Sequence, residues 1–78
     1  DVLIFKVFEN DKDVFLYCRE SIVIVDKSTQ QITKQVPLPD AKYVGDAYCR
    51  NGSIWCCAEK SDGVYKFNMS DYSLKVIH

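Results

Sequence analysis

The stretch VGDAYCRNGSIWCCAEKSDGVYKFN, residues 44–68, holds three apolar runs that are separated by two compact turn signals. The first signal is Arg50-Asn51-Gly52, and the second ends in Asp62-Gly63. Because Asn-Gly and Asp-Gly supply residues that accept positive φ at low steric cost, both sites favour a reversal between adjacent antiparallel strands. The stretch therefore predicts a three-stranded meander.

The same alternation of short apolar runs and polar turns continues along the whole chain and predicts eight strands and no helix. The expected strands span residues 2–8, 14–18, 22–25, 31–36, 43–49, 53–58, 64–67 and 73–77. The run at 14–18 is apolar on both alternating sets, which is typical of a central strand that is covered on both faces. Pro37 and Pro39 interrupt the ladder midway, because proline cannot donate a sheet hydrogen bond.

A repeat decides the fold. Val14 aligns with Ile54 at an offset of 40 residues, and Asp26 aligns with Asn68 at an offset of 42. Each unit is thus four antiparallel strands, and it has about the length of a propeller blade. The sequence predicts an all-β chain of two four-stranded antiparallel propeller-like blades, residues 1–38 and 39–78. An eight-stranded small barrel is the alternative, but it needs one continuous sheet.

Two blades do not close a ring, because propellers use about four to eight. A single four-stranded sheet cannot bury both faces, so it must stack on neighbours of its own kind. We therefore expect this chain to be part of a larger β-propeller, with the remaining blades of a parent chain as partners, or to associate with copies of itself.

The composition indicates which classes of partner and which cellular compartment to expect. Ten basic and eleven acidic side chains are scattered along 78 residues, and the formal charge is -1. Nothing in this pattern attracts nucleic acid or a membrane surface. The sequence shows no signal-peptide pattern and its cysteines lie in apolar runs, so we expect reduced thiols in the cytoplasm or nucleus. Four cysteines and the sequons at Asn51 and Asn68 keep a secreted protein as the alternative.

The second unit resembles the blades of WD-repeat β-propellers. Asn51-Gly52, the apolar run 54–58 and Asp62-Gly63 follow the family's order, and Phe67-Asn68 stands where Trp-Asp would be. The Gly-His dipeptide of the family is absent from both units, so its hydrogen-bonded network of His, Ser or Thr, Asp and Trp cannot be carried over. Related propeller families without these signatures fit nearly as well. The resemblance implies a scaffold for protein–protein interaction.

Catalytic and metal-binding patterns are missing from the sequence. The only histidine is His78, the last residue of the sequence, so it is the only imidazole that could activate a cysteine. The cysteine spacing does not fit zinc, and three glycines do not form a phosphate loop. We expect no catalytic, cofactor-binding or metal-binding residue, and we expect Trp55 to pack in the core.

The predicted function is a non-enzymatic scaffold whose turns contact a partner protein. Arg50, Lys60 and Asp62 are the candidate partner-binding residues, because they are charged and lie in or beside the two turns. The alternative is a secreted or enzyme-associated propeller whose ligand or catalytic groups lie in blades outside this chain.

Overall fold

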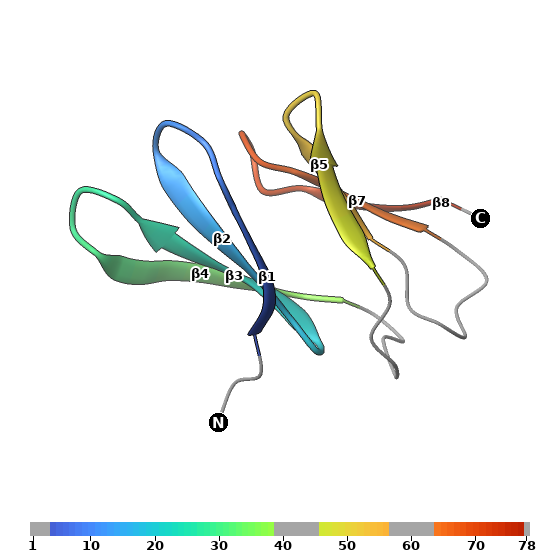
Figure 1. The fold of residues 1–78 in the computed structure, drawn as a ribbon, viewed down its shortest axis with the longest axis horizontal. Helices are drawn as coiled ribbons and strands as arrows, with labels where there is room; N and C mark the ends of the chain where they lie inside the picture. The colour runs from blue at the N-terminus through green and yellow to red at the C-terminus, as the bar shows by residue number, and fades with distance from the viewer. Residues whose placement is uncertain (1–3, 39–45, 57–63, 78) are drawn as a thin grey trace. The chain divides into compact units, whose positions relative to one another are not determined.

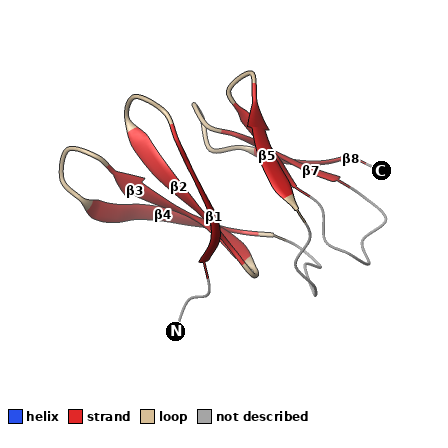
Figure 2. Cartoon of the chain, viewed as in Figure 1, coloured by secondary structure: helices blue, strands red, loops and turns tan. Residues whose placement is uncertain are grey.

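The protein folds into two compact units, residues 1–39 and 40–78, in a computed structural model that describes residues 4–38, 46–56 and 64–77 (Figure 1). Each unit holds one four-stranded antiparallel sheet, so the predicted all-β fold is confirmed. The described residues contain strands and turns and no helix (Figure 2). The strands are β1 (Ile4–Glu9), β2 (Asp13–Cys18), β3 (Ser21–Asp26), β4 (Gln31–Pro37), β5 (Ala47–Arg50), β6 (Ser53–Cys56), β7 (Val64–Asn68) and β8 (Leu74–Ile77).

The first sheet has the strand order β1-β2-β3-β4 and buries one face around its two central strands. Antiparallel pairing aligns Phe8, Phe15, Ile24 and Lys34 in one cross-strand row, which we call the Phe8 row. Phe15 and Ile24 are fully buried at 0% exposure. Tyr17 and Ile22 are buried on the same face, whereas Val23 and Cys18 are buried on the opposite face. Leu38, after β4, is also buried.

The opposite face of the first sheet is apolar and partly open. Val7 pairs with Leu16, and Val25 pairs with Ile32. Val7 is 59% exposed and Ile32 is 68% exposed, whereas Leu16 and Val25 are half-buried. We call this surface the apolar face of the first sheet. Contiguous exposed apolar surface commonly marks a place where another structure packs.

The second sheet repeats the arrangement with the strand order β5-β6-β7-β8. Tyr48, Trp55, Lys66 and Lys75 are aligned in one cross-strand row, which we call the Tyr48 row. The side chains that point to the other face form the core of this unit, and they are Ala47, Ile54, Cys56, Tyr65 and Phe67. The second sheet therefore buries the face opposite the Tyr48 row.

The turn after the third strand is the same in both sheets. The side-chain oxygen Oδ1 of Asp26 accepts hydrogen bonds from the amides two and three residues later, at 2.8 and 3.1 Å. The Oδ1 of Asn68 does the same at 2.8 and 3.2 Å. Both turns close on a residue with positive φ, Gln30 at 59° and Tyr72 at 64°. The offset of 42 residues between Asp26 and Asn68 is the one that the sequence alignment predicts.

Two expected boundaries differ from the structure. The strand expected over 43–49 begins only at Ala47, whose amide donates to the Asp46 carboxylate at 2.8 Å; residues 43–45 lie outside the described part. β4 runs one residue further than expected, to Pro37, which is paired with Ser21, and the first sheet ends there, as the prolines predict. A proline is tolerated there because β4 is an edge strand, where one side of the backbone needs no sheet partner.

Candidate functional site

The candidate site lies on the exposed face of the second sheet, where the β5–β6 hairpin brings aromatic and basic side chains together. The hairpin reverses through Asn51 and Gly52, which have φ values of 51° and 77°. These left-handed conformations are the ones that an Asn-Gly pair adopts readily in a two-residue hairpin turn. The turn sets the register in which Tyr48 of β5 lies directly opposite Trp55 of β6.

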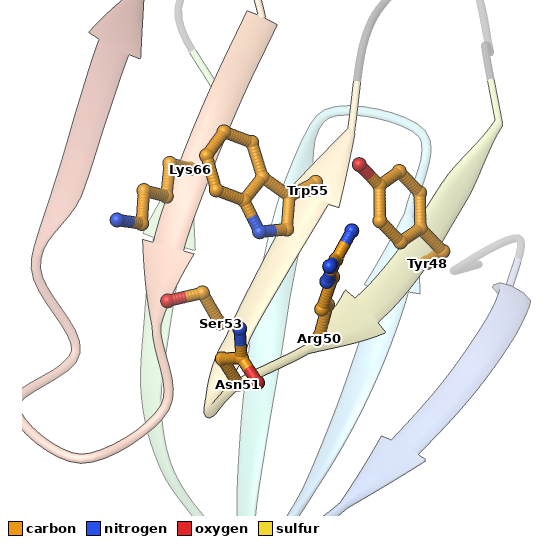
Figure 3. A pocket seen from close by; sticks show the side chains of 6 residues that line it. All are labelled: Tyr48, Arg50, Asn51, Ser53, Trp55 and Lys66. Carbon is orange, nitrogen blue, oxygen red and sulfur yellow. The ribbon is translucent and has the colours of Figure 1, made fainter.

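The side chains on this face line an open cavity of about 370 Å³ (Figure 3). Figure 3 shows Tyr48, Arg50 and Trp55 projecting to the same side of the sheet, and in that view the guanidinium lies between the two rings. Tyr48 is 57% exposed, Arg50 is exposed and Trp55 is half-buried. The described residues that line the cavity are Tyr48, Arg50, Asn51, Ser53, Trp55 and Lys66.

Lys66 of β7 completes the site from the next strand. Its register partner is Trp55, and its ammonium nitrogen lies 5.0 Å from the centroid of the Trp55 ring. A cation over an aromatic face at this distance is attracted by about 0.5–1 kcal/mol at an exposed position. The contact holds a positive charge beside the aromatic wall of the cavity.

The Tyr48 row occupies the same position in its sheet as the Phe8 row does in the first sheet. Ile24 lies two residues before the turn residue Asp26, and Lys66 lies two residues before Asn68. Across the strands, Phe15 of the first sheet therefore corresponds to Trp55. The buried Phe15 and Ile24 of one sheet are thus replaced, in the other, by the half-buried Trp55 and Lys66.

Comparison of the chain with protein-family models, with curated proteins and with solved structures finds no match. The site must therefore be interpreted from its own chemistry. Its side chains combine large aromatic surfaces with cationic donors, and neither feature is a nucleophile paired with a base. This arrangement can bind a ligand, and it offers a guanidinium and an ammonium for the ligand's acceptor atoms.

Of the three predicted partner-binding residues, the described part of the structure includes only Arg50. Arg50, at the end of β5, is exposed and lines the cavity. Lys60 and Asp62 lie outside the described residues. Tyr48 and Lys66 were not predicted, because their place beside Arg50 depends on the pairing of three strands. Trp55 is half-buried on the open face, so the expectation that it packs in the core is wrong.

The described cysteines are free thiols, and their surroundings differ. Cys18 and Cys56 are buried, as expected, and burial raises the pKa of the Cys18 thiol, which keeps it protonated. Cys49 is exposed, contrary to expectation, with its sulfur 3.4 Å from the sulfur of Met69. Cys57 lies outside the described residues.

Three carboxylates elsewhere in the described residues, those of Asp26, Asp71 and Glu9, have structural partners. The Ser28 hydroxyl and the Thr29 and Ser28 amides lower the pKa of Asp26, and the Ser73 hydroxyl and amide lower the pKa of Asp71. A salt bridge from Lys27, 2.7 Å long, lowers the pKa of Glu9. Within the described part of the chain no three His, Cys, Asp or Glu residues are grouped to hold a metal ion, and no helix is long and apolar enough to cross a membrane.

Proposed function

We propose that this chain is a non-enzymatic segment of a larger β-propeller and that it acts as a scaffold for protein–protein interaction. The partner binds on the Tyr48 row and Arg50. The observation that carries the proposal is the open cavity in which an exposed Tyr48, a half-buried Trp55 and an exposed Arg50 project to one side of a sheet. Tyrosine, tryptophan and arginine are the side chains most enriched among residues that dominate binding energy in protein interfaces.

The apolar face of the first sheet supports the propeller part of the proposal. Val7 and Ile32 are largely exposed there, beside half-buried Leu16 and Val25. In repeat proteins each unit buries such a face against a neighbouring unit. We assign this face to a further blade of the same kind, and the more polar Tyr48 row to the partner.

The chemistry of the described residues supports a binding role over a catalytic one. Cys18 is buried with a raised thiol pKa, which is the opposite of what a nucleophilic cysteine requires. Asp26, Asp71 and Glu9 hold turns and a surface salt bridge. The cavity itself offers rings and cations for binding.

The test compares the partners of the native protein with those of a Tyr48→Ala/Trp55→Ala double variant. Truncating interface aromatics commonly costs about 2 kcal/mol or more each when they are hot spots, so at least one specific partner should be lost. The control is Gln31→Ala, an exposed edge-strand position of the first sheet, which should lose none. Circular dichroism of each variant checks that the sheets remain folded. If the double variant keeps every partner, the proposed function is wrong.

A further inference from the structure

We infer that the cavity on the second sheet binds an acidic segment of a protein partner, with the segment's carboxylates held by Arg50 and Lys66 and its apolar atoms packed on Tyr48 and Trp55. This inference rests on the proposed function and adds the chemical class of the partner.

The first support is the balance of donors and acceptors in the cavity. The Arg50 guanidinium and the Lys66 ammonium can only donate hydrogen bonds, and the Trp55 indole N–H is also a donor only. Among the described residues none of the three makes a hydrogen bond or an ion pair, and the one contact of the Lys66 ammonium is with the Trp55 ring. An ionised carboxylate only accepts, and it can accept two parallel bonds from one guanidinium. An acidic side chain would therefore complement the hydrogen-bond donors that have no acceptor in this cavity.

The second support is the local charge. The described residues that line the cavity carry two positive charges and no negative charge, although the chain as a whole has a formal charge of -1. Lys75, the next member of the Tyr48 row, adds a third positive charge on the same face. Asp46, the residue before β5, does not line the cavity, and its carboxylate accepts a hydrogen bond from the Ala47 amide at 2.8 Å. Complementary potentials of this kind steer a partner and set its register.

The third support is the aromatic wall, which favours a peptide over a polyanion. Nucleic acid and anionic lipid are attracted by extended basic surfaces that neutralise many phosphates. Here Arg50 lies between the exposed ring of Tyr48 and the half-buried ring of Trp55 in Figure 3, and Lys66 lies on the other side of Trp55, on β7. A segment that alternates carboxylates with an apolar side chain satisfies the cations and the rings together.

The experiment uses Trp55 as its own reporter, because it is the only tryptophan of the chain. The whole chain is titrated with a short acetylated and amidated peptide of glutamates around one central leucine, and Trp55 emission is followed. The matched probe replaces every glutamate by glutamine. We expect saturable binding of the glutamate peptide, and binding of the glutamine peptide weakened by about tenfold or more, because charge-assisted hydrogen bonds are lost.

Variants then locate the binding charge. Arg50→Gln should weaken binding of the glutamate peptide by about tenfold, and Arg50→Lys should weaken it less, because the charge is kept while the two-pronged contact is lost. The matched control is Arg19→Gln, which removes the same charge from the other arginine of the chain, an exposed residue after β2. That control should change binding by less than about twofold, since Arg19 does not line the cavity and exposed charges are screened by salt.

Several results would overturn the inference. Equal affinity for the two peptides, with loss of both on Tyr48→Ala, would mean that the cavity binds partners through apolar contact; the proposed function would then stand and the acidic partner would not. Absence of binding of either peptide, or equal effects of Arg50→Gln and Arg19→Gln, would also reject the acidic partner. Tighter, Arg50-dependent binding to phosphatidylserine vesicles than to the peptide would replace it with a lipid surface.

Discussion

The two sheets share a strand order and the turn after the third strand, yet they differ in what the same row of side chains does. In the first sheet the Phe8 row places Phe15 and Ile24 at 0% exposure. In the second sheet the corresponding row places Trp55 and Lys66 on the wall of an open cavity. The backbone pairing requires only that residues fit a pleated ladder. A repeat can therefore keep its fold while one row changes from core to the wall of an open cavity.

The sharpest way to break this comparison is to exchange one side chain between the rows. Ile24→Lys puts the lysine of the second sheet into the buried position of the first. It should lower the free energy of unfolding by about 3–5 kcal/mol, because a buried charge then lacks a partner. The reciprocal Lys66→Ile should change stability by less than about 1 kcal/mol, since it removes only a half-buried cation–aromatic contact. Denaturant unfolding of both variants measures the difference. Equal losses would contradict the different roles of the two rows.

A smaller effect tests whether the turns that define the repeat are held by their side chains. Asn68→Ala removes the oxygen that accepts from the amides of Ser70 and Asp71, and should cost about 1 kcal/mol. Asn68→Asp, which restores the acceptor found at Asp26, should recover most of the loss. Thermal unfolding of the two variants checks this. A loss from Asn68→Ala that Asn68→Asp does not recover would mean that the turn is not held by its side-chain oxygen.

The smallest expected effect is a pH dependence of the stability of the fold, which arises from Asp26 in the turn after β3. Hydrogen bonds from Ser28 and Thr29 lower the pKa of the Asp26 carboxyl below its ordinary value of 3.8. A carboxyl with a lowered pKa in the folded state stabilises the fold above its unfolded pKa, and this contribution is lost as the pH falls through the folded pKa. The Asp26→Asn variant, which carries the residue of the second turn, should therefore lose less stability than the native chain as the pH falls below about 4. Acid titration followed by circular dichroism measures this. An unchanged titration curve would show that Asp26 does not contribute.

Much of the fold could be predicted from the sequence because its turns have distinctive chemistry. Asn51-Gly52 ends β5 and begins a hairpin as expected, and the alignment of Asp26 with Asn68 holds in the hydrogen bonds of both turns. The open face could not be predicted by alternation, because the run at 53–58 is apolar on both alternating sets. That pattern does not indicate which face of the strand is covered, so the sequence places Trp55 in the core although it lies on the open face.

The candidate site was predicted only at Arg50, since a charged residue beside a turn is an obvious binding candidate. Tyr48 and Lys66 join it through register, which links residues that are far apart in the sequence. One signal was available: the offset of 42 residues aligns Lys66 with Ile24. A lysine at the repeat position of a core isoleucine indicates that the face has a different use.

The most direct test of the central claim is the accessibility of Trp55, measured by acrylamide quenching of the chain's single tryptophan in the folded and the urea-unfolded state. Because Trp55 is half-buried on the wall of an open cavity, we predict a folded-state quenching constant that is a substantial fraction of the unfolded value. Saturating acidic peptide should reduce it further. Quenching near zero in the folded chain without peptide would show that Trp55 is a core residue, and it would contradict both the binding face and the difference between the two sheets.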